Sequence, residues 1–217
     1  MENDILKNFV VFEGIDGAGT STQIERLRSS TFSNRIFTTA EPTKTETGIF
    51  LRRVLSGEIK VDERTAAYLF AADRAEHIWG KHGIEEKCKS GMVCISDRYF
   101  FSSLAYQGSQ IGEKLPRLLN SPFPLPELLF FFEIDPALSL QRIGERSKRE
   151  IYEEIEFLKK TAARYKSVVD SFEGSNMKIV RIDATKSIDE VCARIWEELS
   201  KMPIFKEESE KSGGIIG

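Results

Sequence analysis

The sequence is poor in cysteine and histidine and has neither a long apolar run nor a long basic run. Its 217 residues include three cysteines and two histidines. The cysteines are far apart and form no C-x-x-C pair, which argues against a disulfide framework and a zinc site. His77 and His82 have no acidic or cysteine partner at metal-ligand spacing, so we expect no metal role for them. Together these absences predict a cytoplasmic protein with reduced thiols.

The missing runs also limit the partners that the protein can have. The longest apolar run, residues 128–134, is too short to span a bilayer, and the acidic, polar first eight residues are unlike a signal peptide. Because the net charge is -3 and no long basic run occurs, binding to nucleic acid or to a membrane is not expected. The 41% of hydrophobic residues are enough for one sizeable core.

Short apolar runs alternate along the chain with segments of helical length. Runs rich in β-branched and aromatic residues are typical of strands that are buried on both faces of a parallel sheet. Strands that alternate with helices indicate βαβ units with right-handed crossovers. The sequence therefore predicts an α/β fold, a five-stranded parallel sheet with helices on both faces. The expected strands are residues 9–13, 35–39, 92–96, 128–134 and 178–183.

Helices are expected over four of the intervening segments. Residues 63–91 read as one long helix that stops at Gly91. Ser187 is a good N-cap, and Glu190 three residues later completes a capping box. We expect a single domain over residues 1–205 and a flexible, charged and then glycine-rich tail over 206–217. The other expected helices are residues 22–30 and 149–172.

The stretch FVVFEGIDGAGTST (9–22) places a glycine-rich loop between a strand and a helix. It follows the phosphate-loop pattern G-x-x-x-x-G-K-[ST], except that Thr20 stands at the lysine position. Backbone N–H groups of such a loop can hold phosphate, and Ser21 occupies the position whose hydroxyl reaches Mg²⁺. The alternative is a turn that uses glycine only for backbone freedom. The candidate phosphate-binding residues are Gly14, Ile15, Asp16, Gly17, Ala18, Gly19, Thr20, Ser21 and Thr22.

An acid and an arginine, Asp97 and Arg98, follow the expected strand 92–96 directly. Ligands of parallel sheets bind beyond the carboxyl ends of the strands, so this pair should lie at the same edge as the glycine loop. The acid could hold Mg²⁺ through water, and the arginine could bind a phosphate. Taken alone, the two residues are better explained as a helix cap and a solvated charge. Two strand ends with complementary chemistry favour the binding site.

Two further segments suit a nucleotide. Phe70 and Arg74 are four residues apart on one helix face, where the ring could stack on a base and the arginine could bind its edge. Alone, Phe70 is better explained by a core position. Residues 142–150 contain several basic side chains and could close over a triphosphate as a short lid. The alternative is a helix surface with i,i+4 ion pairs. The basic residues of this segment are Arg142, Arg146, Lys148 and Arg149.

These motifs, in their order along the chain, resemble the thymidylate kinases of the nucleoside-monophosphate kinase group of P-loop proteins. The resemblance runs from FVVFEGIDGAGTSTQ through EPTKTETGIFLRRVL, YLFAADRAEH and SDRYFFSSLAYQG to the basic segment, and so covers nearly the whole chain. It implies the fold of the P-loop nucleoside triphosphate hydrolases. It also implies transfer of the γ-phosphate of ATP to dTMP with Mg²⁺, and a homodimer.

The resemblance also implies roles for individual residues. Phe70 would stack on the thymine, and Tyr106 would pack under the deoxyribose. Arg52 and Arg98 would hold the acceptor phosphate, and Asp16 would meet the 3′-hydroxyl or a metal-bound water. Asp97 and Ser21 would hold the metal. The residues assigned to dTMP are Glu41, Pro42, Arg52, Phe70, Arg74, Arg98, Ser103, Tyr106 and Gln107.

The sequence departs from the family pattern at two positions. Thr20 replaces the loop lysine, and Ala40 stands where many members have arginine. Both departures remove positive charge near phosphates, where a charged hydrogen bond contributes about 1.5–3 kcal/mol. Family members with glycine at position 17 tend to carry the catalytic arginine in the lid. We therefore expect a lid arginine to supply the missing charge, and the catalytic candidates are Asp16, Arg98, Arg142, Arg146 and Arg149.

Other functions remain open at the level of the sequence. One is a kinase for another pyrimidine nucleotide or nucleoside. Another is a catalytically weakened relative that binds nucleotide as a regulatory or interaction module. The presence of the expected base pocket together with Asp16, Ser21 and Arg98 favours an active dTMP kinase.

Overall fold

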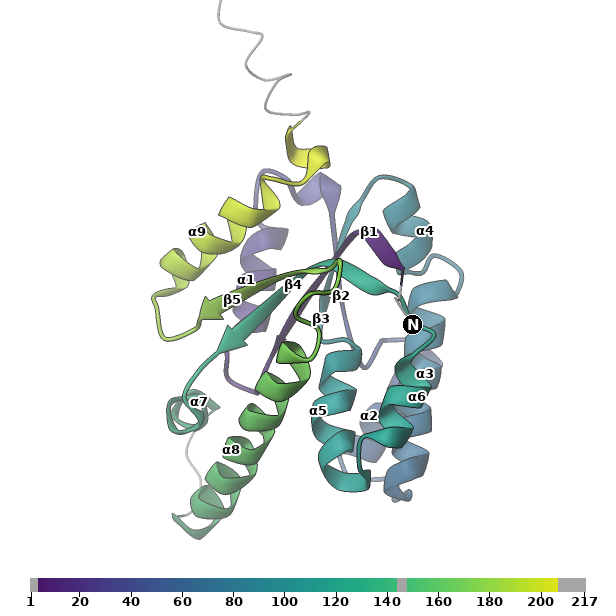
Figure 1. The fold of residues 1–217 in the computed structure, drawn as a ribbon, viewed down its shortest axis with the longest axis vertical. Coiled ribbons are helices and arrows are strands. Elements are labelled where there is room, and N and C mark those ends of the chain that lie inside the picture. Colours follow the sequence, from purple (N-terminus) through teal and green to yellow (C-terminus); the bar gives the residue numbers. More distant parts are fainter. Residues whose placement is uncertain (1–3, 144–147, 207–217) are drawn as a thin grey trace, which may run out of the picture.

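A computed structural model describes residues 4–143 and 148–206, with the backbone alone for 148–154. Five strands form one parallel sheet in the order β2-β3-β1-β4-β5 (Figure 1). This confirms the predicted sheet, and each strand lies within a few residues of its expected position. The strands are β1 (Ile5–Gly14), β2 (Ile36–Ala40), β3 (Val93–Asp97), β4 (Leu125–Glu133) and β5 (Lys178–Asp183).

The central strand β1 shows why the apolar runs are continuous. Phe9 and Val11 belong to the core on one face of the sheet, and Val10 and Phe12 belong to the core on the other. Because successive side chains of a strand point to opposite faces, a strand buried on both sides needs apolar residues at every position. All four side chains are fully buried.

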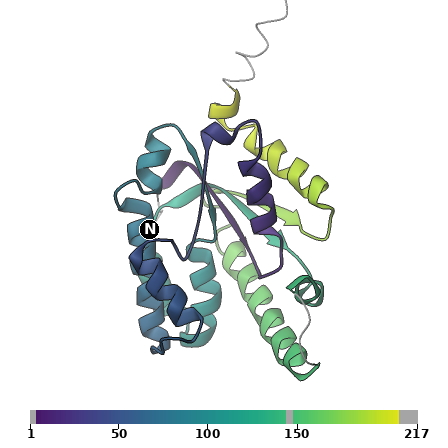
Figure 2. The same ribbon diagram turned by 180° about the vertical axis from the view of Figure 1, so that it is seen from behind.

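Helices cover both faces of the sheet, as the two views in Figures 1 and 2 show. Helices α1 (Thr20–Arg28) and α9 (Ile188–Leu199) bury apolar side chains against one face. The other face is covered by α3 (Glu63–Trp79), α4 (Ile84–Lys89), α5 (Phe100–Ile111) and α8 (Lys148–Asp170). The remaining elements are the 3-10 turn η1 (Ser33–Arg35) and helices α2 (Glu46–Leu55), α6 (Lys114–Asn120) and α7 (Pro136–Ile143).

The expected single helix over residues 63–91 is wrong, because non-helical residues between α3 and α4 interrupt it. Gly80 leaves α3 in an extended conformation with ψ of 168°, and His82 has a positive φ of 62°. A Cβ at Gly80 would meet the carbonyl oxygen of Glu76 at 2.4 Å, so the chain turns away here only because this residue is glycine. The predicted stop at Gly91 is confirmed by its φ of +87° just after α4.

The predicted capping box of α9 is confirmed. The Ser187 hydroxyl accepts a hydrogen bond from the Glu190 backbone at 3.2 Å, and the Glu190 carboxylate accepts one from the Ser187 backbone at 3.0 Å. This box fixes where α9 begins, beside the carboxyl end of β5. The expected flexible tail lies, from residue 207 onward, outside the described residues, as do residues 144–147 of the expected lid.

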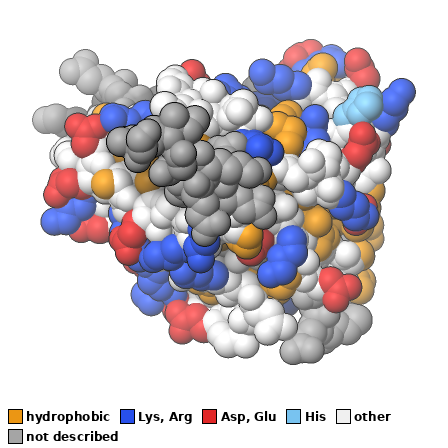
Figure 3. Space-filling model, turned by 90° about the horizontal axis from the view of Figure 1, so that it is seen from above, with side chains coloured by type: hydrophobic (Ala, Val, Ile, Leu, Met, Phe, Trp, Pro, Cys, Tyr) orange, Lys and Arg blue, Asp and Glu red, His pale blue; other side chains and the backbone are white. Residues whose placement is uncertain are grey.

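The described surface carries charges of both signs. On the face shown in Figure 3, lysine and arginine side chains are interspersed with aspartate and glutamate around small apolar areas. No helix in the described ranges is long and apolar enough to cross a membrane.

Candidate active site

The glycine loop leaves β1 and enters α1 in a conformation that glycine permits. Gly17 has a φ of +77°, and a Cβ there would meet the Ser139 carbonyl oxygen at 2.6 Å. The buried Ser139 hydroxyl donates a hydrogen bond to the carbonyl oxygen of Asp16. Helix α7 therefore lies directly against the loop, and a side chain at position 17 would separate the two.

The loop opens onto a cavity of about 610 Å³ at the N-terminus of α1. Gly19 is the N-cap of α1, with a φ of +93°, and no side chain caps the first turn of this helix. The first N–H groups of a helix lack partners within it and carry partial positive charge, which suits an anion. Residues 15–22 line this cavity, whereas Gly14 packs against β4 instead. The described cations along its wall are Arg98, Arg142 and Lys186.

Ser21 and Asp97 lie together in this cavity. The Ser21 hydroxyl donates a hydrogen bond to the Asp97 carboxylate at 2.8 Å. The prediction that Asp97 and Arg98 share a sheet edge with the loop is thereby confirmed. Hard oxygen ligands of this kind fit Mg²⁺, which usually takes one or two protein oxygens together with water and phosphate. Within the described ranges, no group of three or more histidine, cysteine or acidic side chains could hold a metal on its own.

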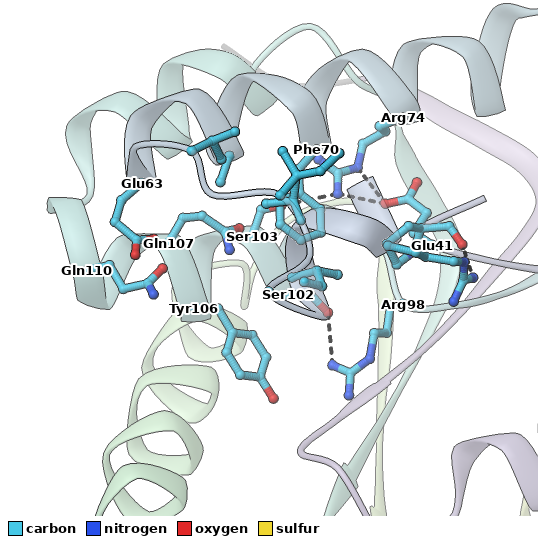
Figure 4. A pocket seen from close by; sticks show the side chains of 18 of the residues that line it. Glu41, Glu63, Phe70, Arg74, Arg98, Ser102, Ser103, Tyr106, Gln107 and Gln110 are labelled. Atoms are coloured by element: carbon cyan, nitrogen blue, oxygen red, sulfur yellow. Dashed lines mark hydrogen bonds and ion pairs between the residues drawn. The ribbon is translucent and has the colours of Figure 1, made fainter. Parts of the chain in front are cut away.

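A second cavity, of about 720 Å³, adjoins the first (Figure 4). It lies between α2, α3 and α5 at the carboxyl ends of β2 and β3. Phe70 is half-buried in its wall, across from Tyr106 and Arg98 in Figure 4. The structure brings together here every residue that the resemblance assigns to dTMP. These residues are Glu41, Pro42, Arg52, Phe70, Arg74, Arg98, Ser103, Tyr106 and Gln107.

Arg74 is held by the protein more tightly than the sequence suggests. It is 1% exposed and donates to the Glu41 carboxylate through Nε at 2.9 Å and Nη2 at 2.6 Å. Its other described acceptors are Asn120 and the Ser103 hydroxyl. Four of the five guanidinium N–H groups are therefore occupied by described acceptors, and one Nη1 N–H has none among them.

A buried aspartate arranges the segment before α2. Asp73 is 1% exposed and accepts hydrogen bonds from the Thr43 backbone at 2.8 Å and from the Thr43 hydroxyl at 2.6 Å. The Thr47 hydroxyl donates to the same carboxylate at 2.9 Å. Arg52, in turn, donates to the carbonyl oxygens of Pro42 and Thr43. The threonines thus fold this segment onto α3 and orient Arg52 along the wall of the cavity.

Two buried polar groups of α5 have no partner among the described residues. They are the side-chain carbonyl oxygen of Gln107 and the hydroxyl of Tyr106. Burial raises the pKa of Tyr106 to about 12, although the nearby Arg98 charge opposes this. Because a buried polar group without a hydrogen bond costs about 1–3 kcal/mol, both residues are suited to a polar ligand in this cavity.

The two cavities meet at one ion pair. Arg98 Nη2 donates to the Asp16 carboxylate, and both residues line both cavities. Arg98 has a positive φ of 71°, and its backbone N–H donates to the Phe12 carbonyl oxygen at 2.9 Å. Its Nη1 donates to the hydroxyls of Tyr165 at 3.0 Å and Ser102 at 3.3 Å. The arginine is therefore fixed at both its backbone and its guanidinium.

Glu13, at the end of β1, lies behind these hydroxyls and is fully buried. It accepts hydrogen bonds from the Tyr99 backbone at 2.8 Å, the Ser102 hydroxyl at 2.7 Å and the Tyr165 hydroxyl at 2.9 Å. Burial raises the pKa of Glu13 to about 7, although the Arg98 charge and these hydrogen bonds oppose the change. Among the described carboxylates whose pKa is shifted, Glu13 alone has a pKa raised this far.

Sequence patterns did not indicate several of these groups. Glu13 looks like the end of a strand, and Tyr165 looks like a core position of α8. Asn120 and Lys186 have no motif around them.

Of the predicted lid arginines, Arg142 is exposed at the wall of the first cavity. Two further candidates, Arg146 and the side chain of Arg149, lie outside the described residues.

The raised pKa of Glu13 predicts a pH-dependent stability. The folded state holds a proton on Glu13 up to about pH 7, whereas the unfolded chain releases it near the ordinary value of 4.5. Stability from this group is therefore full below pH 4.5 and is lost as the pH rises through 7. The difference corresponds to about 3 kcal/mol. Denaturant unfolding should show this loss between pH 5 and 8 relative to Glu13→Gln, which cannot titrate.

Glu198→Gln is the matched control for this measurement. Burial opposes ionisation of Glu198, but hydrogen bonds from Lys178, Lys201 and Arg194 lower its pKa to about 2. Its charge is therefore constant between pH 5 and 8, and the stability difference between this variant and the wild type should stay constant. An equally flat difference for Glu13→Gln would contradict the prediction.

Comparison with known proteins identifies the family of this chain. A family model described as thymidylate kinase matches residues 12–195. A Treponema pallidum (strain Nichols) protein assigned as a thymidylate kinase is 38% identical over 200 residues, covering 90% of this chain and 96% of its own. The thymidylate kinase of Leptospira borgpetersenii serovar Hardjo-bovis (strain L550) is 34% identical over 199 residues, covering 87% and 91%.

A solved structure shares the fold of this chain. The crystal structure of thymidylate kinase from Ehrlichia chaffeensis superposes with a TM-score of 0.64 at 23% identity, covering 88% of this chain and 97% of that one. The sheet and its flanking helices are therefore shared. With the matched family model and these relatives, the chain belongs to the thymidylate kinase family.

Proposed function

We propose that the protein transfers the γ-phosphate of ATP to dTMP and forms dTDP, as the names of its relatives suggest. The observation that carries this proposal is the meeting of two cavities at the Asp16–Arg98 pair. One cavity has a phosphate loop, and the other has an aromatic and polar wall. A donor and an acceptor bound in them would bring their phosphates together at Arg98.

The second cavity suits a pyrimidine nucleotide. The half-buried ring of Phe70 could stack on a base, and stacking of this kind contributes about 1–3 kcal/mol per base. The unpaired Gln107 amide oxygen and the remaining Arg74 N–H could meet the donor and acceptor groups on the edge of thymine. We assign Tyr106 to the sugar and Arg52 and Arg98 to the acceptor phosphate.

Transfer between two phosphates depends on placing two anions in line and on cations that spread the developing charge. The uncapped first turn of α1 and the loop amides would hold the donor phosphates. Arg98, already fixed by Asp16, Ser102 and Tyr165, would supply charge between donor and acceptor. Ser21 and Asp97 would hold Mg²⁺, which when bound neutralises phosphate charge.

A comparison of acceptors tests the proposed function. With ATP and Mg²⁺ in a coupled assay, turnover should be highest with dTMP and lower with dUMP, dCMP and thymidine. Thymidine lacks the phosphate that Arg52 and Arg98 would hold, so it should be the poorest acceptor. A preference for thymidine would refute the assignment of the second cavity. A folded protein without turnover would instead identify a nucleotide-binding relative that has lost activity.

The missing loop lysine predicts a second result. Arg142 is the described lid cation at the donor cavity, so Arg142→Met should lower kcat by about 100-fold. Because the lid already supplies the charge, Thr20→Lys should change kcat of the wild type by only about threefold. A thousandfold gain with Thr20→Lys would contradict this compensation. Arg26→Met is the control, since Arg26 pairs with Asp189 on the surface at 2.6 Å and should leave kcat unchanged.

We also propose a cytoplasmic homodimer of one domain, residues 1–205. The three cysteines are free thiols, which supports a reducing compartment.

Ile49 and Phe50 on α2 and Tyr68 on α3 are large apolar side chains with 45%, 38% and 55% exposure. Helices α2 and α3 pack together, so these side chains could form an interface. Light scattering should give the mass of two chains for the wild type and the mass of one chain for Tyr68→Glu. A monomeric wild type would contradict the dimer.

A further inference from the structure

We infer that Glu13 is a positioning residue whose buried carboxylate fixes Arg98, through the hydroxyls of Ser102 and Tyr165, where the two cavities meet. The importance of Arg98 for catalysis rests on the proposed function. The coupling between Glu13 and Arg98 does not, because it follows from the contacts of the unliganded protein.

The two oxygens of the Glu13 carboxylate have separate partners. Oε1 accepts from the backbone N–H groups of Tyr99 at 2.8 Å and Ser102 at 3.2 Å, at the N-terminus of α5. Oε2 accepts from the hydroxyls of Ser102 at 2.7 Å and Tyr165 at 2.9 Å. A role confined to capping α5 needs only Oε1. The contacts of Oε2 lead toward Arg98 and give this carboxylate its second role.

The hydroxyls transmit the state of Glu13 because each of them has a single proton. The two hydroxyl oxygens are 2.6 Å apart, and Arg98 Nη1 donates to both of them. Three short oxygen contacts join Glu13 Oε2 and the two hydroxyls, and an ionised Glu13 leaves only two protons for them. A protonated Glu13 or a glutamine at this position brings a donor of its own. The hydroxyl protons are then redistributed, which changes the charge and the lone-pair directions that face Arg98.

The surroundings leave this cluster little freedom to rearrange. Tyr165 is fully buried, with its ring stacked on Phe131 and edge-on to Tyr106. The backbone of Arg98 is held by the Phe12 carbonyl oxygen, one residue before Glu13. Strand β1 therefore holds Arg98 in two ways. The Phe12 carbonyl oxygen binds the Arg98 backbone, and Glu13 holds the two hydroxyls that bind the Arg98 guanidinium. The ionisable groups that act on Glu13 from the packed elements are Arg98, Tyr106 and Tyr165.

A mutant cycle tests whether Glu13 acts through the two hydroxyls. Glu13→Gln should lower kcat for dTMP by about 100-fold, the effect of a displacement of about 1 Å in a phosphate-binding group. The double variant Ser102→Ala/Tyr165→Phe should lose a similar factor. Adding Glu13→Gln to this double variant should lower kcat by less than about a further threefold, because the contacts between Glu13 and Arg98 have already been removed. Losses that multiply would overturn the inference. Glu198→Gln, which removes a buried carboxylate that lines neither cavity, should leave kcat unchanged.

A second readout does not need turnover and so separates this inference from the proposed function. In the unliganded wild type, the Arg98 Nε resonance followed by ¹⁵N NMR should shift with a midpoint near the Glu13 pKa of about 7. In Ser102→Ala/Tyr165→Phe this shift should be lost. An Arg98 signal that does not titrate in the wild type, or one that titrates equally in both proteins, would overturn the inference even if dTMP is phosphorylated. Lack of turnover with the expected titration would contradict only the proposed function.

Discussion

A carboxylate buried at the end of the central strand requires partners, and the groups that satisfy Glu13 are those that build the site. Burial disfavours the ionised form of such a group, and hydrogen bonds and a counter-charge compensate for only part of the lost water. Here the start of α5, the Tyr165 hydroxyl of α8 and the guanidinium of Arg98 provide that compensation. One constraint thus ties the sheet to two helices and places an arginine beside the phosphate loop.

The second cavity is arranged in the same manner before any ligand binds. Glu41 holds Arg74, and Asp73 holds the threonines that lead to Arg52. Groups that are already oriented lose little freedom when a ligand arrives, which favours both affinity and catalysis. The unsatisfied Gln107 amide oxygen and Tyr106 hydroxyl are the exceptions among the described groups of this wall. The polar network therefore fixes the shape of the cavity and leaves a small number of groups for recognition.

The sequence predicts those features that depend on short stretches of chain. The five strands and the capping box of α9 follow from local patterns, and the loop residues 15–22 and the nine residues assigned to dTMP follow from motif order. The Glu13–Tyr165 contact joins residues 152 positions apart, so no local pattern could reveal it. Asn120 is likewise recognisable only from its contact with Arg74. The helix break at Gly80 was missed because Gly91 was taken as the stop of the segment, although Gly80 ends α3.

The position of the Asp16–Arg98 pair has a thermodynamic consequence. Because these two side chains belong to the walls of both cavities, a ligand that draws Arg98 away from Asp16 in one cavity changes the charge presented to the other. Two ligands that act on this pair in that way would not bind independently. Whatever factor the first ligand applies to the affinity of the second, the second applies to the first, whether that cooperativity is positive or negative.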